Sequence, residues 1–334
     1  MMGKFSSEKL SEIISCITSS SRVIVPPTPG CDAGVYEIAD EWYMVVSTDP
    51  CTGVPQDWFG WLLIQYPSSD VALFGARPIL ASIDLVGPVG TSYRKYKKIM
   101  NQACLAAQEL QMDIITGHTG NYPSVSQIIG VCTVTGFTHN TQLITPANSK
   151  PEDFILIVKP LGLETVTNFS FTNYRKSKSL FGAKNTQHLR SLIKHQTCVK
   201  EALLLAECKG VHALHDTTEG GLVAALNEMA DTSRLGFEIF YDDIPIQDEM
   251  QQLQEHFNLT TVEVLSTSST GGLIAAISPL NKDEITAMLT KKGLTHRIIG
   301  RFSKKMGRYL SIEKRKQRFP IIATDPYAKI FYTN

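Results

Sequence analysis

The chain has 334 residues, of which 43% are hydrophobic and 19% are charged. This length is about twice that of a typical domain, so two domains are expected and a minimal disulfide-stapled scaffold is excluded. The 32 basic and 32 acidic residues balance, which removes the electrostatic signature of a dedicated nucleic-acid binder. Such a composition is typical of a chain that folds along its whole length.

The seven cysteines are odd in number and show no CxxC spacing. Neither a disulfide framework nor a thiolate zinc site is therefore indicated, and reduced thiols fit a cytoplasmic location best. The first residues lack a long apolar core followed by a cleavage site, and no apolar run approaches the roughly 20 residues that span a bilayer. We expect a cytoplasmic protein with neither a membrane nor a nucleic-acid partner.

Helices and strands alternate in the first half of the chain. Apolar periodicity predicts helices over 7–19 and 93–110 and strands over 22–25, 43–46, 79–86, 113–116 and 127–137. The apolar segment that begins at Asp57 predicts a buried helix, which Pro67 should kink or break and Gly75 should end. Asp70 would then sit just beyond that break.

The second half repeats this style, which indicates α/β or α+β layers in both halves. A polar stretch, 140–153, separates predicted domains at 1–148 and 149–334. Helices are expected over 188–208, 222–230, 249–257 and 282–292, strands over 154–158, 236–241, 273–277 and 297–299, and a loop over 176–185. The basic segment 301–318 is interpreted as a solvated face, with a polyanion site as the alternative.

The common nucleotide and metal signatures are missing: the sequence contains no P-loop, no GxGxxG after a strand and no HExxH. What remains are carboxylates at predicted turns beside small residues, namely Asp32, Asp49, Asp70 and Asp216. Mg²⁺ prefers oxygen ligands, and an ATP site requires carboxylates delivered from separate loops. Taken singly, each aspartate is more often a helix cap or a turn residue.

Two glycine-containing runs are further candidates. Gly220 and Gly221 precede a predicted helix, where backbone N–H groups can approach an anion. The same run also suits a capping box followed by a tight packing turn, and the sequence leaves both interpretations open. The run 115–120 could carry His118 to a phosphate, although a lone loop histidine is more often structural.

Five motifs, taken in order, resemble the aminoimidazole-ribonucleotide-synthetase-like (PurM-like) superfamily. They are PGCDAGV at 29–35, STDPCTG at 47–53, SSDVALFGARP at 68–78, TGHTG at 116–120 and HDTTEGGLVAALNEMA at 215–230. The match runs from about Val23 to Phe302. Within this superfamily, which also includes selenophosphate synthetase and thiamine-monophosphate kinase, the motifs look most like those of the hydrogenase expression/formation (HypE) branch.

The resemblance implies a two-domain α/β (α+β) fold. An AIR-synthase-like N-terminal domain would bind ATP and dimerise through a shared β-barrel, and the C-terminal domain would be a layered α/β domain. ATP and Mg²⁺ would be the cofactors, a small molecule the substrate and a homodimer the assembly. Carried over residue by residue, the motifs imply metal ligands at Asp32, Asp49 and Asp70, catalytic roles for His118 and Asp216, and nucleotide contacts at Gly30, Asp32, Thr48, Gly117, Thr119, Glu219, Gly220 and Gly221.

The chain departs from the superfamily pattern at three polar positions. Cys31 precedes Asp32 where two adjacent acidic residues are often found, Ser69 replaces an asparagine, and Gly120 stands where an acidic residue is expected. The hydrogenase-maturation dehydratase also ends in a reactive cysteine, whereas the last cysteine here is Cys208. A true hydrogenase-maturation role is therefore not expected.

The leading hypothesis is an ATP- and Mg²⁺-dependent enzyme that phosphorylates or dehydrates an unknown amide-like small molecule. Such chemistry depends mainly on positioning and on charge neutralisation by the metal. One alternative is a small-molecule kinase of the thiamine-monophosphate kinase type. The other is a catalytically inactive nucleotide-binding or interaction protein, which the three departures motivate.

Overall fold

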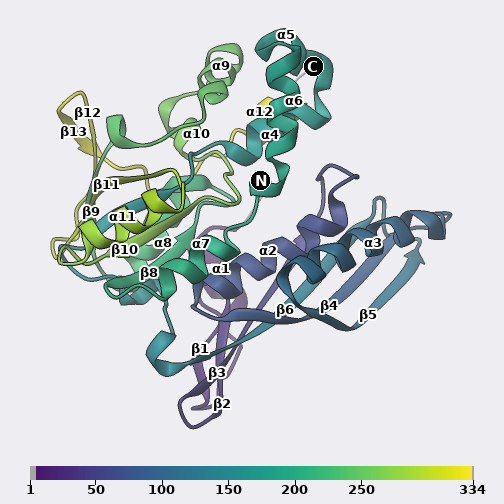
Figure 1. Ribbon diagram of the computed structural model, residues 1–334, viewed down its shortest axis with the longest axis horizontal. Coiled ribbons are helices and arrows are strands. Elements are labelled where there is room, and N and C mark those ends of the chain that lie inside the picture. The colour runs from purple at the N-terminus through teal and green to yellow at the C-terminus, as the bar shows by residue number, and fades with distance from the viewer. Residues whose placement is uncertain (1–4, 333–334) are drawn as a thin grey trace. The chain divides into compact units, whose positions relative to one another are not determined.

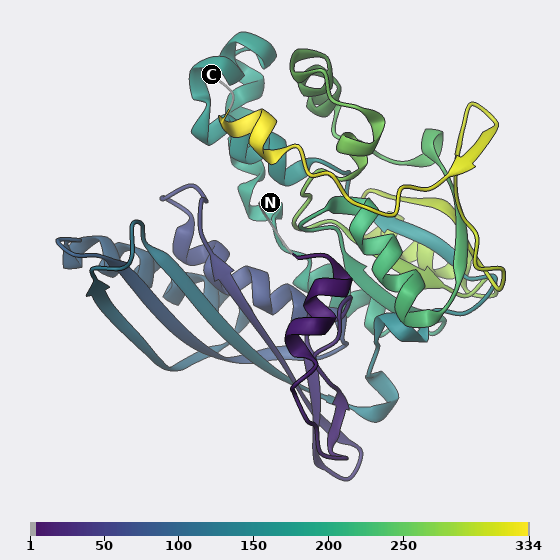
Figure 2. The ribbon, with the colours of Figure 1, turned by 180° about the vertical axis from the view of Figure 1, so that it is seen from behind.

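The structure, a computed structural model, describes residues 5–332 and divides them into two compact units (Figures 1 and 2). The six-stranded unit comprises residues 16–28 and 32–143. The seven-stranded unit comprises residues 5–15, 29–31 and 144–332. Each unit is built on one mixed sheet with helices packed against it, so the predicted α/β two-domain class is confirmed.

The sheet of the six-stranded unit has the order β1-β2-β3-β6-β4-β5. Neighbouring strands are antiparallel except for β4 and β5, which run parallel. Helices α2 and α3 cover one face of the sheet (Figure 1). In β6, accordingly, every second residue from Gly130 to Thr138 is buried, because these residues point toward the helices. The elements are β1 (Val23–Val25), β2 (Gly34–Ala39), β3 (Trp42–Cys51), α2 (Phe59–Leu73), β4 (Arg77–Pro88), α3 (Tyr93–Leu110), β5 (Asp113–Tyr122) and β6 (Ile129–His139).

Helix α2 continues through Pro67, so the predicted break is wrong. Proline removes the backbone donor that would bond the carbonyl of Leu63. The neighbouring hydroxyls of Ser68 and Ser69 donate to other carbonyls, those of Ile64 and Gln65, at 2.7 and 2.8 Å. Nearly all of the helix is buried between the sheet and α3, and this packing outweighs the local cost of the proline. Asp70 therefore lies in the last turn of a helix rather than beyond one.

The strand predicted over 113–116 is longer than expected. β5 extends from Asp113 to Tyr122, so the TGHTG motif lies within a strand and not in a loop. As the edge strand of the sheet, β5 is mostly exposed, and its polar and glycine residues give it the composition of a loop. Likewise, Asp49 lies within β3 and not at a turn.

The seven-stranded sheet has the order β13-β12-β9-β11-β7-β10-β8, with one parallel pair, β9 and β12. β10, which lies between β7 and β8, is buried along its whole length, as expected for an inner strand covered on both faces. Helix α8 packs on one face through a core that includes Leu226, Met229 and Phe237. The elements are β7 (Phe154–Val158), α7 (Val199–Ala206), β8 (Val211–Asp216), α8 (Gly221–Ser233), β9 (Gly236–Phe240), β10 (Leu273–Ile277), α11 (Lys282–Lys291), β11 (His296–Ser303), β12 (Arg308–Ile312) and β13 (Arg315–Arg318).

A cluster of helices in the same unit has its own small core, which contains Phe169, Leu189, Met250 and Ile330. Its helices are α4 (Leu163–Thr172), α5 (Tyr174–Phe181), α6 (Ala183–Ser191), α9 (Asp248–Phe257), α10 (Thr261–Leu265) and α12 (Tyr327–Tyr332). The region 176–185, expected to be a loop, therefore belongs to α5 and α6. The single helix predicted over 188–208 is instead α6, a short 3-10 segment and α7.

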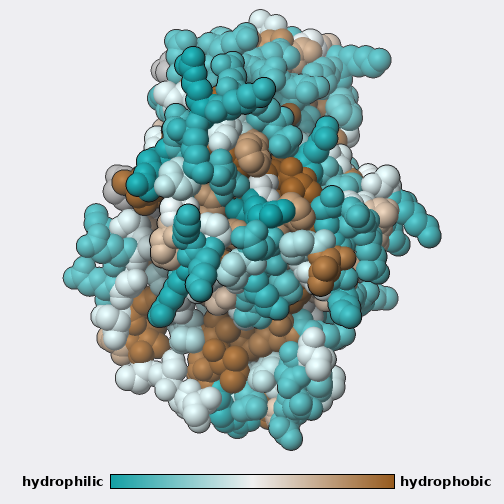
Figure 3. All heavy atoms as spheres, turned by 90° about the vertical axis from the view of Figure 1, so that its left-hand side faces the viewer, coloured by the Kyte–Doolittle hydropathy of each residue, from teal (hydrophilic) through white to brown (hydrophobic). Residues whose placement is uncertain are grey.

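Helix α1 (Ser7–Ile14) belongs to the seven-stranded unit and buries none of its residues. Within residues 5–332, no helix combines the length and apolar character that crossing a membrane requires. The face seen in Figure 3 is mostly hydrophilic, and its hydrophobic side chains gather in separate patches.

Candidate functional site

Two of the predicted metal carboxylates, Asp49 on β3 and Asp70 on α2, lie on the helix-covered side of the six-stranded sheet. The Ser47 hydroxyl on β3 donates a 2.7 Å hydrogen bond to the Asp70 carboxylate on α2, and both residues are buried. Asp49, two residues after Ser47, faces the same way because side chains alternate along a strand. Cys132 lies directly opposite Asp49 on β6; burial and, secondly, the charge of Asp49 raise the pKa of its thiol to about 12.

Thr48 and His118 lie on the other, helix-free face of this sheet. Thr48 is opposite Thr133, with the two hydroxyls 2.9 Å apart. His118 is opposite Asp84 in the parallel pair of β4 and β5, and its Nε2 lies 2.5 Å from the Tyr122 hydroxyl. The structure therefore separates these two predicted residues from Asp49 and Asp70 by the thickness of the sheet.

Gly117 and Thr119 alternate with His118 along β5 and thus share the face of Asp49. A Cβ at Gly117 would lie 2.0 Å from the carbonyl oxygen of Ile83, so close strand packing alone requires glycine there. A Cβ at Gly120 would lie 3.0 Å from the Tyr122 ring and 3.3 Å from Nε2 of His118, and the Gly120 carbonyl accepts a 3.2 Å hydrogen bond from the Tyr96 hydroxyl. These contacts give the glycines of TGHTG a structural reason that is independent of any ligand.

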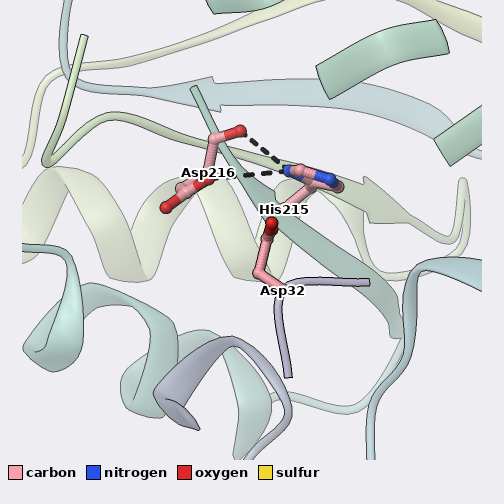
Figure 4. Close-up of side chains that lie close together, drawn as sticks. All are labelled: Asp32, His215 and Asp216. Carbon is pink, nitrogen blue, oxygen red and sulfur yellow. Dashed lines mark hydrogen bonds and ion pairs between the residues drawn. The ribbon is translucent and has the colours of Figure 1, made fainter. Parts of the chain in front are cut away.

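In the seven-stranded unit the candidate residues lie between β8 and α8. Asp216 ends β8, and its carboxylate accepts a 3.1 Å hydrogen bond from the Thr218 hydroxyl. Figure 4 shows His215 beside Asp216, with its Nδ1 2.9 Å from the Asp216 carbonyl and 3.7 Å from the carboxylate. The possible ligand atoms of His215 and Asp216 lie within 4.8 Å of one another. The end of β8 could therefore bind a cation, or the two side chains could share a proton.

The sequence analysis missed His215 and Glu228. His215 is buried, and its Nε2 lies 3.0 Å from the Glu228 carboxylate on α8. The pair therefore couples the end of the strand to the helix that follows it. The available signal was the His-Asp pair at the end of a predicted strand; the thirteen-residue separation of His215 and Glu228 matches no standard motif.

The turn that follows Asp216 is tightly built. Gly220 and Gly221 have φ angles of +85° and +57°, and a Cβ on Gly221 would lie 2.6 Å from the carbonyl oxygen of Thr267. The Gly221 N–H donates to the Thr218 carbonyl at 2.8 Å, and the Gly220 N–H donates to the Asp325 carboxylate. The protein itself thus uses the two N–H groups that were candidates for an anion.

The predicted loop residues Gly30 and Asp32 stand where the chain passes from one unit to the other. Gly30 has a φ of +84°, and a Cβ there would lie 3.0 Å from Cβ of Glu228 in the same unit. Asp32, also drawn in Figure 4, follows Cys31 directly and opens the main segment of the six-stranded unit. Gly30 therefore has a packing role beside the helix that carries Glu228.

Comparisons with known proteins cover most of the chain. The family profile for the N-terminal domain of AIR synthase related proteins matches residues 30–138, and the profile for their C-terminal domain matches residues 150–311. The chain is 28% identical to a putative hydrogenase expression/formation protein of Methanocaldococcus jannaschii, over 70% of this chain and 67% of that protein. It is 24% identical to a selenide, water dikinase of Carboxydothermus hydrogenoformans, over 89% and 91% of the two chains.

A crystal structure of the hydrogenase maturation protein HypE in complex with ATP has the same fold. Its TM-score is 0.68 at 18% identity, and the match covers 98% of this chain and 97% of that one. At this identity the likeness shows the shared fold.

Proposed function

Because the chain belongs to the AIR synthase related protein family, we propose that it is an ATP- and Mg²⁺-dependent enzyme acting on a small molecule. The observation that carries the proposal is the hydrogen bond from Ser47, two residues before Asp49, to Asp70, which brings together two motifs whose aspartates are 21 residues apart in the sequence. A relative of the same fold whose structure contains ATP supports the choice of nucleotide. The substrate class proposed is an amide-like group that is phosphorylated or dehydrated.

The donor set in the six-stranded unit fits Mg²⁺. Asp49 and Asp70 offer carboxylate oxygens, and a magnesium ion prefers such oxygens together with water and substrate phosphate. A buried carboxylate such as Asp70 also benefits from a cation, because burial otherwise penalises its charge. Asp32 completes the proposed metal ligands. Bound Mg²⁺ would neutralise the phosphate charge that develops during transfer.

The remaining roles follow the same assignment. Gly117, Thr119, Gly30 and Glu219 would contact the nucleotide, and Asp216 would act near the reacting groups. Thr48 and His118 are not given such roles, because they lie on the other face of the sheet, and neither are Gly220 and Gly221, whose N–H groups bond within the protein. Asp216 is held by the Thr218 hydroxyl and lies beside buried His215, which keeps its carboxylate in one orientation. A fixed carboxylate can orient an acceptor or take its proton without rearrangement.

A kinase that transfers phosphate to a stable product is the second candidate. The likeness to a selenide, water dikinase favours it, because that match covers 89% of the chain. Product analysis separates the two functions: a phosphorylated product that accumulates indicates a kinase, and phosphate release with a dehydrated product indicates the leading function.

The test is ATP turnover with quantification of ADP, AMP and phosphate. Asp49→Asn and Asp70→Asn should each lower turnover by at least about 100-fold, because each removes charge at the transferring group. Asp113→Asn, an exposed aspartate at the start of β5, is the matched control and should turn over ATP like the wild type. Wild-type rates in both site variants would refute the assignment, provided that circular dichroism shows them folded.

A homodimer is part of the proposal. The helix-free face of the six-stranded sheet carries half-buried apolar residues such as Met44, Val46 and Val131, which a second sheet could cover. Light scattering should give a mass of about twice the 36.9 kDa of one chain. A mass of one chain at micromolar concentration would contradict this part.

A further inference from the structure

The basic segment 301–318 carries eight basic residues and one acidic residue, Glu313. Its residues 308–318 form the β12–β13 hairpin, which Figure 1 labels and which ends the seven-stranded sheet on one side. All four residues of β13 are exposed, and three of them are basic. The proposed enzyme uses no residue of this hairpin, so neither its charge nor its exposure follows from that function.

The register of the hairpin shows which backbone groups of β13 point outward. Its two-residue turn, 313–314, has φ angles of +47° and +66°, as in the tight turns that close on a hydrogen-bonded pair. Farther along, the Phe319 N–H donates to the Arg308 carbonyl at 3.0 Å. Because bonded and non-bonded pairs alternate along an antiparallel ladder, Lys316 and Arg318 direct their N–H and C=O groups away from β12. Within the described residues, no strand pairs with that edge.

The side chains of Lys316 and Arg318 lie on one face of the sheet, beside Tyr309 of β12. Their charged groups stand 4.2 and 5.3 Å from the centre of the Tyr309 ring. Lys316 also pairs with Glu238 on β9, yet its side chain stays 48% exposed. No carboxylate in the described part of the chain pairs with Arg315 or Arg318. The edge thus presents cationic groups with little local neutralisation.

These features distinguish among the partners that an open strand edge can take. A second copy of the same edge would place cation beside cation, which is unfavourable directly across a sheet. Single-stranded nucleic acid needs free aromatic faces for its bases, whereas the Tyr309 ring already contacts two cations. An acidic peptide in extended conformation satisfies both the outward backbone groups and the positive charge.

We propose that β13 is a docking site for an extended, acidic segment of another protein, which adds to the seven-stranded sheet as a further strand beside β13. The N–H and C=O groups of Lys316 and Arg318 would hydrogen-bond to the backbone of that segment. Acidic side chains at alternate positions of the segment would face the side chains of Lys316 and Arg318, because residues opposite each other across a sheet share a face. This docking site is independent of the proposed enzyme, since the hairpin contains none of the residues assigned to ATP or Mg²⁺.

The probe is a peptide of about eight residues in which glutamate alternates with valine, because such a segment has acidic residues on one face and a high β-propensity. Calorimetry should show binding in the millimolar range or tighter. Amide hydrogen exchange at Lys316 and Arg318 should slow by about tenfold or more at saturation, since their N–H groups gain acceptors. The same peptide with its backbone nitrogens methylated keeps the charge but cannot donate to β13, and it should bind about tenfold more weakly.

Two variants separate the edge strand from the basic segment as a whole. Arg318→Gln removes a charge on β13 and should weaken peptide binding about threefold. Lys305→Gln removes a charge that is also exposed and belongs to the same segment but lies outside β13, and it should leave the affinity unchanged.

Equal losses of affinity in the two variants, equal binding of the N-methylated peptide, or unchanged exchange at Lys316 and Arg318 would overturn the proposal. Tighter binding of a thymidine oligonucleotide than of the acidic peptide would also overturn it and would identify a general polyanion surface instead. The same holds for an acidic peptide that does not bind at millimolar concentration. Peptide binding that protects both amides and is lost on N-methylation would support the docking site, whether or not the protein turns over ATP.

Discussion

Replacing Ser47 by alanine tests the link between β3 and α2 that positions the carboxylates. The deleted hydroxyl donates at 2.7 Å to Asp70, and the two residues are 3% and 6% exposed. A hydrogen bond to a charged group contributes about 1.5–3 kcal/mol, and little water can replace this donor. We therefore expect Ser47→Ala to lower the free energy of unfolding of the six-stranded unit by about 2 kcal/mol.

Tryptophan fluorescence during urea unfolding is the assay. All three tryptophans of the chain, Trp42, Trp58 and Trp61, belong to the six-stranded unit, so the signal reports on that unit alone. Thr48→Ala is the matched control: its hydroxyl is bonded at 2.9 Å to Thr133, but it is exposed on the opposite face, where water substitutes. It should cost less than about 1 kcal/mol.

Ser47→Ala should therefore lower the free energy of unfolding more than Thr48→Ala does. An unfolding midpoint of Ser47→Ala that matches that of Thr48→Ala, with equal denaturant slopes, would refute the reasoning that a buried hydroxyl holds Asp70 in place. A fall of about 2 kcal/mol in both variants would refute the assignment of the two faces of β3.

Three further predictions concern the seven-stranded unit. Gly221→Ala should lower its thermal stability by at least about 3 kcal/mol, because φ is +57° and the new Cβ would lie 2.6 Å from the Thr267 carbonyl oxygen. Glu228→Ala should cost about 2 kcal/mol more than Glu228→Gln, which keeps a partner 3.0 Å from buried His215; equal melting curves would contradict this. Burial raises the pKa of Asp325 to about 6 from 3.8, so the contact of its carboxyl group with the Gly220 turn is strongest at low pH and weakens as the pH rises from 3.8 to about 6. Protection factors of the backbone amides of residues 320–327 should fall about tenfold from pH 5 to pH 8, and Asp325→Asn should abolish that change.

The sequence predicted the class of the fold because apolar periodicity is strong in the buried elements. The strands 154–158 and 273–277 were predicted with the bounds that the structure gives, since each is a short, continuous apolar run of the kind that forms buried strands. The failures lie where tertiary contacts override local preference. Pro67 was expected to break a helix, yet the burial of α2 on nearly all sides keeps it continuous.

The remaining failures are exposed or polar elements. The extension of β5 is stabilised by its pairing with β4 and not by its own residues, which are typical of a loop. The lysine- and serine-rich segment 174–191 folds as α5 and α6 because a few residues such as Phe181 and Leu189 reach a shared core. Such thin apolar stripes give little periodic signal.

For the candidate site, the sequence identified residues but not their grouping. The motifs named Asp49 and Asp70 without showing that Ser47, two residues before Asp49, bonds to Asp70, because that contact depends on how α2 lies across β3. They also placed Thr48 and His118 with these carboxylates, whereas strand alternation puts those two on the other face. Asp325, 105 residues after Gly220, contacts the turn through a segment that no motif marked.

Calorimetric titration of the wild-type protein with ATP, in the presence and absence of Mg²⁺, tests the central claim most directly. The account predicts binding that depends on the metal, because carboxylates alone would repel the phosphates. It also predicts that Asp49→Asn weakens the metal-dependent binding of ATP while the protein stays folded. Absence of ATP binding at millimolar nucleotide, or equal binding with and without Mg²⁺, would contradict the claim that this chain is an ATP- and Mg²⁺-dependent enzyme.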